Sequence, residues 1–203
     1  MKKISLSVFI LLILMIGVSF AEIAKNENEN ATSNQESKTQ TSGEAFDKMM
    51  QVLMHERCVN CHPAGDKPLK GGDSHVTRSL GLPRGEDGHG PRGINCTTCH
   101  TDENNDFSGV PGAPHWALAP ESMAWEGKTR VEIAQQMMDP ERNGGRSHHD
   151  IMEHLIEHEL VLWAWDPGVD AEGIPREKPP VSKEDFIAAV KEWINNGAVI
   201  PEQ

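Results

Sequence analysis

Two short motifs of cysteine and histidine are the residues of this sequence whose types and spacing are best suited to chemistry. They are Cys58-Val59-Asn60-Cys61-His62 and Cys96-Thr97-Thr98-Cys99-His100. The pattern Cys-x-x-Cys-His is the attachment signature of c-type haem. Its two thiols add across the vinyl groups of the porphyrin, and the adjacent histidine binds the iron. The sequence contains no cysteine outside these motifs.

Two other chemistries also use paired cysteines. Two Cys-x-x-Cys pairs can form a tetrahedral zinc site, although a zinc ribbon needs no histidine after each pair. Thioredoxin-like exchange uses one pair at the start of a helix, which fits two pairs poorly. We therefore predict two haem c groups. The predicted thioether positions are Cys58, Cys61, Cys96 and Cys99, and the predicted proximal iron ligands are His62 and His100.

The short separation of the motifs predicts that the two haems share one compact unit. Their first cysteines, Cys58 and Cys96, are 38 residues apart. Domains rarely contain fewer than about 50 residues, so a complete mono-haem domain does not fit between them. Neighbouring haems in one unit would exchange electrons rapidly.

The sixth ligand of each iron sets its potential, because methionine raises the potential and histidine lowers it. Met123 follows a proline-rich loop after the second motif, and we predict that it binds the second iron, with His115 in the same loop as the rival. His75 lies in a glycine-flanked loop that can fold back over the first haem, and we predict that it binds the first iron. His154 is the alternative distal ligand, since it shares a helical face with Ile151.

The histidines around residue 150 allow one further interpretation. His154 and His158, with His148 and His149 nearby, could bind a divalent metal. Solvated or hydrogen-bonded histidines are the simpler explanation of the same pattern.

The first 21 residues resemble a secretory signal peptide. Lys2 and Lys3 precede an apolar run, and small residues at Ser19 and Ala21 predict cleavage after Ala21. The alternative is a retained membrane anchor, because the run is about long enough to span a bilayer. Since c-type haem attachment is completed outside the cytoplasm, a signal peptide agrees with the motifs and predicts a periplasmic protein.

Residues 22–42 are rich in Asn, Glu, Ser, Thr and Gln and predict a disordered polar linker. The remaining residues, 43–203, form the predicted di-haem domain. Without residues 1–21 the chain has 17 basic and 31 acidic residues, a net charge of −14. Such acidity argues against nucleic acid as a partner. It suits redox proteins with a basic docking face, and a membrane is a partner only if the N-terminal segment is retained.

Periodicity and capping signals predict four helices and no strand. A capping box at residues 41–44 opens the first, whose apolar residues recur at helical spacing up to Cys58. Thr129 with Glu132 opens a second, through Met138. Ser147 with Asp150 opens a third, through about Trp163, and Ser182 with Asp185 opens the last, which ends at Gly197. Between Pro63 and Gly93 we expect loops. The predicted fold class is therefore mainly α, with cytochrome c-like helices and long loops wrapped around two covalently bound haems.

These features together resemble a family of small bacterial di-haem c-type cytochromes often labelled "isoquinoline 1-oxidoreductase subunit". The resemblance spans roughly residues 58–201. Besides the two haem motifs, it is carried by Asp66 to Gly72 with His75, Pro114-His-Trp-Ala-Leu-Ala-Pro120, Met123-Ala-Trp-Glu-Gly127, Asp139-Pro-Glu-Arg-Asn-Gly-Gly145, His154, Leu160-Val-Leu-Trp-Ala-Trp165 and Trp193-Ile-Asn-Asn-Gly-Ala198.

The resemblance implies a di-haem fold and an electron-transfer role, and it favours His75, Met123 and His154 among the candidate distal ligands. The family label implies service to a molybdenum hydroxylase. Two positions depart from the family pattern. Val199-Ile200-Pro201 lacks a cysteine that the family often has before its final proline, and Ala134 stands where the family often has another. Both absences remove a possible disulfide.

The functional hypothesis is a periplasmic di-haem cytochrome that carries electrons one at a time from a dehydrogenase or respiratory donor to an acceptor. Two alternatives assume one open or displaceable axial site. They are a small peroxidase-like enzyme, for which the motifs lie unusually close together, and a haem sensor, for which no output domain is evident.

We predict that Met123→Ala lowers one of the two midpoint potentials markedly, because it would remove a thioether ligand that favours ferrous iron. Potentiometric titration of the haem-loaded protein measures this. An unchanged pair of potentials would refute the assignment of Met123 as a ligand.

Overall fold

The computed structural model describes residues 40–70 and 82–202 of the chain. The predicted signal peptide, residues 22–39 of the predicted linker and the predicted ligand His75 lie outside the described residues. A compact unit extends from Ser42 onward.

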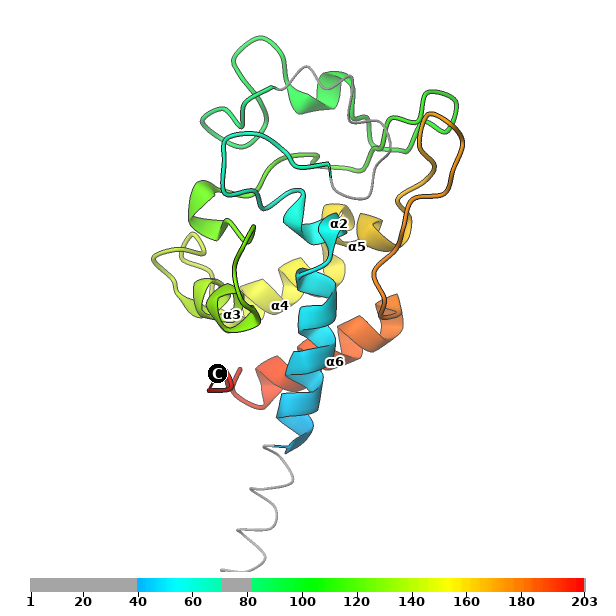
Figure 1. Cartoon of the computed structure of the whole chain (residues 1–203). Coiled ribbons are helices and arrows are strands. Elements are labelled where there is room, and N and C mark those ends of the chain that lie inside the picture. Colours follow the sequence, from blue (N-terminus) through cyan, green and yellow to red (C-terminus); the bar gives the residue numbers. More distant parts are fainter. Residues whose placement is uncertain (1–39, 71–81, 203) are drawn as a thin grey trace, which may run out of the picture. The chain divides into compact units, whose positions relative to one another are not determined.

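Helices and long loops make up the described residues, which contain no sheet (Figure 1). The α-helices are residues 40–53, α2 (Glu56–Val59), α3 (Arg130–Met138), α4 (His148–Glu157), α5 (Glu159–Leu162) and α6 (Lys183–Asn195). Three short 3-10 helices are η2 (Cys96–Thr98), η3 (Glu121–Met123) and η4 (Trp163–Trp165). The prediction of a mainly α fold with long loops is confirmed. None of the described helices is both long and apolar enough to cross a membrane.

The start of the first helix differs from its prediction. Residue 40 is already helical, so Thr41, the capping residue of a box at residues 41–44, lies inside the helix, and Ser42 follows it with its side chain buried. A capping residue would instead have extended backbone and accept a hydrogen bond from a free N–H group of the first turn. The capping-box interpretation of residues 41–44 was therefore wrong. The serine lies on the side of this helix that packs into the core.

The caps of α3 and α6 are confirmed. The Thr129 side chain accepts a hydrogen bond from the Glu132 backbone, and the Glu132 carboxylate accepts one in return from the Thr129 N–H at 2.7 Å. Ser182 caps α6 through the Asp185 N–H. At the other end Gly197, with a φ of +93°, lets the Ala198 N–H reach back to the Trp193 carbonyl at 2.9 Å.

The predicted helix from Ser147 to about Trp163 is interrupted. α4 begins at the predicted Ser147–Asp150 capping box but ends at Glu157. His158 has extended backbone (φ −70°, ψ 123°), and its carbonyl accepts hydrogen bonds from Val161 and Leu162 in a new short helix, α5. The break redirects the chain at His158.

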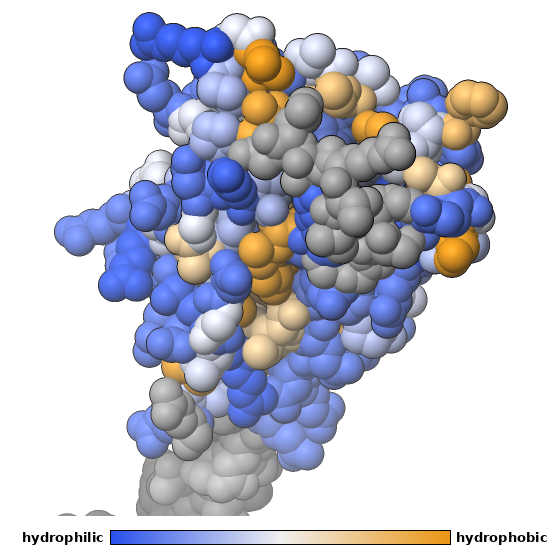
Figure 2. Space-filling model, turned by 45° about the horizontal axis from the view of Figure 1, so that its top comes forward, coloured by the Kyte–Doolittle hydropathy of each residue, from blue (hydrophilic) through white to orange (hydrophobic). Residues whose placement is uncertain are grey.

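A single apolar core joins the long helices. The helix of residues 40–53 contributes six buried side chains, and α3, α4 and α6 pack around it (Figure 1). Phe46 and Trp193, both with no exposed surface, lie at its centre with ring centroids 5.8 Å apart. On the face shown in Figure 2, hydrophilic residues predominate among the coloured ones and are interrupted by apolar residues in several places. The helices therefore form a frame to which the loops bearing the cysteine motifs are attached.

Buried arginine side chains hold the loops by donating hydrogen bonds to main-chain carbonyls. The Arg176 guanidinium donates to the carbonyls of Pro167 (3.0 Å), Val169 (2.5 Å) and Gly109 (2.6 Å). Gly109 has a φ of +68°, and a Cβ there would lie 2.1 Å from the backbone nitrogen of Ala171. Two loops far apart in the sequence are thus held in direct contact.

We predict that Phe46→Ala lowers the free energy of unfolding by about 3–5 kcal/mol, because it leaves a cavity at the centre of the core. Phe107→Ala is the matched control, since Phe107 is fully exposed and should change stability by less than about 0.5 kcal/mol. Urea denaturation followed by circular dichroism measures both. Equal effects of the two changes would contradict this description of the core.

Candidate haem-attachment site

A compact turn presents the first Cys-x-x-Cys-His motif. His55 caps α2, and its Nδ1 accepts a hydrogen bond from the Arg57 N–H at 3.3 Å. Cys58 lies in α2. The Cys61 N–H then donates to the Cys58 carbonyl at 3.1 Å, and the His62 N–H donates to the Val59 carbonyl at 3.0 Å. This helical turn brings the two thiols and the imidazole of the motif close together.

The His62 ring is fixed by the segment around Met123. Its Nδ1 donates a hydrogen bond to the Met123 carbonyl at 2.6 Å, because a carbonyl can only accept. In return, the His62 carbonyl accepts from the Trp125 N–H at 2.8 Å. The Trp125 ring stacks on the imidazole, with centroids 3.5 Å apart and planes 7° from parallel. With Nδ1 protonated, Nε2 keeps the lone pair that can bind a metal.

The second motif repeats this arrangement with other partners. Its cysteines flank η2, and the His100 N–H donates to the Cys96 carbonyl at 2.9 Å. His100 Nδ1 donates to the Pro111 carbonyl at 2.7 Å. The Trp116 ring stacks on the imidazole, with centroids 4.5 Å apart and planes 6° from parallel. Two imidazoles from different parts of the chain are thus held by the same pair of contacts.

Asn104 secures the stack on His100 from behind. Its Oδ1 accepts hydrogen bonds from Trp163 Nε1 at 2.9 Å and from the Gly112 N–H at 3.1 Å. Its Nδ2 donates to the Asp166 carbonyl at 2.8 Å. Trp163 meets Trp116 edge to face, with centroids 5.0 Å apart. Asn104 therefore connects α5 and η4 to the ring that supports the histidine.

Residues 116–119, which we call the bridging segment, join the two motifs. Trp116 at one end stacks on His100, and the Ala119 N–H at the other donates to the Cys61 carbonyl at 3.0 Å. Between them, the Leu118 N–H donates to the Gly88 carbonyl at 2.9 Å. Gly88 has a φ of +85°, a Cβ there would lie 2.3 Å from the Leu118 oxygen, and its carbonyl is 4.0 Å from Cys96 Sγ. The motifs are therefore neighbours in space.

Burial keeps both motif histidines neutral. It lowers the pKa of His62 to about 4, with smaller contributions from His154 and Arg84. Burial also lowers the pKa of His100, against the hydrogen bond to Pro111, which raises it. A neutral imidazole is the form that binds iron, so both histidines are ready to act as ligands at neutral pH.

The thiols lack the properties of a zinc site or of a redox-active pair. Burial raises the pKa of Cys58 to about 12 and that of Cys61 to about 11, whereas exchange chemistry needs a lowered pKa. All four cysteines are free thiols. In residues 40–70 and 82–202, no group of three or more ligand atoms that could hold one ion includes a cysteine. The four sulfurs therefore do not converge on a tetrahedral centre.

Met123 lies beside the first motif through its backbone. It is the last residue of η3, and its side chain is buried in the helical core. Its carbonyl accepts the hydrogen bond from His62 Nδ1. The prediction that its sulfur binds the second iron remains a prediction. Since the residue also fills core volume, Met123→Leu is the matched variant that removes the thioether while keeping the packing.

Three histidines form a row next to the first motif. His154 on α4 lies 4.9 Å from His158, ring centroid to centroid, and His158 lies 5.6 Å from His115. Burial, with smaller contributions from His158 and Arg146, lowers the pKa of His154 to about 4. His154 in turn contributes to the lowered pKa of His62. The structure thus brings the predicted alternative ligand His154 and the predicted rival His115 into one neighbourhood. His158 joins them because α4 ends there, which periodicity could not indicate.

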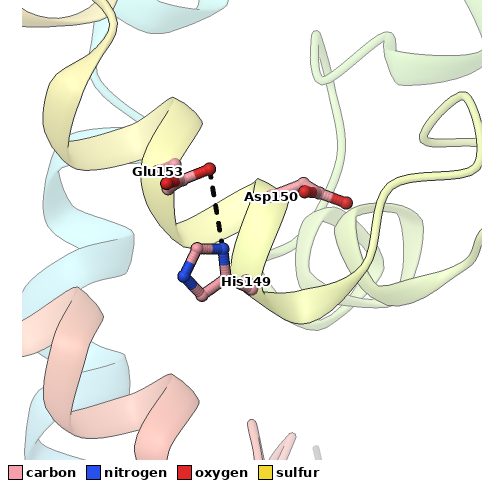
Figure 3. Close-up of side chains that lie close together, drawn as sticks. All are labelled: His149, Asp150 and Glu153. Atoms are coloured by element: carbon pink, nitrogen blue, oxygen red, sulfur yellow. Dashed lines mark ion pairs between the residues drawn. The ribbon is translucent and has the colours of Figure 1, made fainter.

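The divalent-metal interpretation of these histidines is not supported. In the described part of the chain, no three of His148, His149, His154 and His158 bring ligand atoms within reach of one ion. His149 instead groups with Asp150 and Glu153 on the exposed side of α4 (Figure 3). Asp150 accepts hydrogen bonds from Ser147 in the helix cap, and His149 pairs with Glu153 at 3.5 Å. Helix capping and an ion pair account for this group.

Comparison of the chain with protein-family models, with curated proteins and with solved structures finds no match. The functional argument therefore depends on the motifs and on the geometry around them.

We predict that Asn104→Ala lowers stability by about 1–3 kcal/mol, because it leaves the Trp163 indole and the Gly112 amide without their acceptor. It should also alter the spectrum of only the haem bound at His100. Asn105→Ala is the control, since the Asn105 side chain also accepts two hydrogen bonds, both from backbone N–H groups, but is exposed. Thermal unfolding and electron paramagnetic resonance of the oxidised protein measure both effects. Indistinguishable variants would contradict the supporting role of Asn104.

Proposed function

We propose that this chain is an exported di-haem c-type cytochrome that carries electrons one at a time between redox proteins. The observation that carries the proposal is the matched environment of the two motif histidines. Each donates its Nδ1 proton to a main-chain carbonyl, at 2.6 and 2.7 Å, and each stacks on a tryptophan. Metal-bound histidines usually donate their second nitrogen to such an acceptor, which fixes the tautomer and the ring orientation.

The donor set fits covalent haem. Four thiols without disulfides stand at the attachment spacing, and each motif supplies one neutral imidazole. Two buried ring nitrogens near the first motif, Trp125 Nε1 and His158 Nδ1, have no hydrogen-bond partner among the described residues. Buried polar groups without hydrogen-bond partners are rare in native proteins, so we expect a bound group such as haem beside these two nitrogens. When bound, haem iron supplies a one-electron ferric–ferrous couple.

The chain's own residues would orient, seal and tune these groups. His62 and His100 would be the proximal ligands, and Cys58, Cys61, Cys96 and Cys99 would hold the haem edges. Of the distal candidates, His154 is near His62, Met123 lies in the core, and His75 lies outside the described residues. The two tryptophans and the helical core behind them would exclude water from the proximal sides. The bridging segment supports close approach of the two haems and rapid exchange between them.

The charge of the protein supports redox partners with a basic docking face. With 31 acidic and 19 basic residues, the chain is strongly acidic, and complementary charge accelerates encounter more than it tightens binding. The N-terminal apolar run supports delivery to the periplasm. The proposed electron donor is a dehydrogenase or a respiratory protein, in line with the family resemblance.

The proposal is tested by producing the full chain in a bacterial host that matures c-type cytochromes. We expect the intact mass to increase by two haems and a pyridine haemochrome assay to give two haems per chain. Cys61→Ser and Cys99→Ser should each weaken attachment of one haem only. A protein that leaves the host with free thiols and no haem would refute the proposal.

Addition of carbon monoxide distinguishes the electron carrier from the two alternative functions, a peroxidase-like enzyme and a haem sensor. We expect the visible spectrum of the reduced protein to remain unchanged after addition of the gas, because two six-coordinate irons leave no free site. An adduct on one haem would instead favour the peroxidase-like enzyme or the haem sensor.

A further inference from the structure

Arg84 is a buried cation held entirely by main-chain carbonyls. Only 7% of its surface is exposed, although it lies in a loop. Its guanidinium donates to the carbonyls of Gly65 (2.8 Å), Pro63 (3.2 Å) and Ala119. Within the described residues, no carboxylate forms an ion pair with it. The Asp66 carboxylate accepts a hydrogen bond from the Arg84 backbone N–H at 3.2 Å and not from its guanidinium.

A buried guanidinium with only carbonyl partners has its donors satisfied but keeps its net charge. Such a charge is costly, because burial removes the hydration that stabilised it. Its field is also screened much less than that of a surface charge. The buried Arg84 guanidinium therefore creates a lasting positive potential in its surroundings.

The guanidinium lies beside the first attachment motif. Pro63, whose carbonyl Arg84 binds, directly follows His62. Ala119, whose carbonyl it also binds, donates its own N–H to the Cys61 carbonyl at 3.0 Å. The guanidinium thus contacts residues on both sides of the Cys61–His62 pair. After the larger effect of burial, the Arg84 charge also helps to lower the pKa of His62.

We propose that Arg84 is a positioning and tuning residue whose fixed positive charge raises the reduction potential of the haem attached at Cys58 and Cys61. Oxidised iron carries one more positive charge than reduced iron, so a nearby buried cation disfavours the oxidised state. This inference rests on the proposed function, because it requires haem at the first motif. It does not depend on which residue is the distal ligand.

The test measures both midpoint potentials of the haem-loaded, full-length protein by spectropotentiometry. We expect Arg84→Gln to lower one potential and leave the other unchanged, and we expect Arg84→Lys to stay nearer the wild-type value because it keeps the charge. Arg92→Gln is the matched control. It removes the same charge from the same loop, but Arg92 is solvent-exposed and pairs with Glu86 at 3.2 Å. It should leave both potentials unchanged.

Two results would overturn the inference. One is an Arg84→Gln protein with two attached haems and wild-type potentials. The other is an Arg84→Lys protein whose potential falls as far as that of Arg84→Gln, because then the carbonyl contacts and not the charge would matter. If the glutamine variant does not take up haem, the lysine variant is compared with the wild type alone, and a first-haem potential well below the wild-type value overturns the inference. A wild-type chain without haem would refute the proposed function itself, which the haem assay detects separately.

Discussion

The hydrogen bond from a motif histidine to a main-chain carbonyl is the contact on which the rest of the site depends. It settles which ring nitrogen carries the proton, and therefore which one can bind a metal. It also ties each motif to another segment of the chain. His62 is tied to Met123, 61 residues away in sequence, and His100 to Pro111. The parallel tryptophan beside each ring then limits its rotation. Both motifs use this combination, although the carbonyl and the tryptophan come from different residues in each case.

The helical core and the loops have different sources of stability. Helices from both ends of the chain bury apolar side chains against one another, and this part is held by ordinary hydrophobic packing. The loops between them bury little apolar surface. Polar side chains bind their carbonyls and amides instead, as the buried Arg176 and the half-buried Asn104 do. Such contacts specify a loop conformation closely, because each donor has a fixed direction. The cysteine motifs lie where these two parts meet.

The two cysteine motifs have different neighbours, although a buried arginine lowers the histidine pKa in each, Arg84 for His62 and Arg176 for His100. The first adjoins Arg84 and the row of histidines that begins with His154. The second adjoins an aromatic group formed by Trp116 and Trp163. A two-centre electron carrier benefits from such a difference, since unequal potentials give the electron a preferred direction. The bridging segment keeps the two surroundings adjacent while contributing a separate residue to each.

The sequence by itself determined the local features. The proposal of haem attachment comes from adjacent residues, because the Cys-x-x-Cys-His pattern can be recognised without tertiary context. Thr129 and Ser182 correctly predicted the starts of their helices, because a capping side chain forms its hydrogen bond within three residues in the sequence. Tertiary structure alone decided the rest. Packing extended the first helix through Ser42, ended α4 at His158, and chose Met123 and Pro111 as the carbonyl partners. These outcomes depend on contacts between residues far apart in the chain, which periodicity and spacing do not encode.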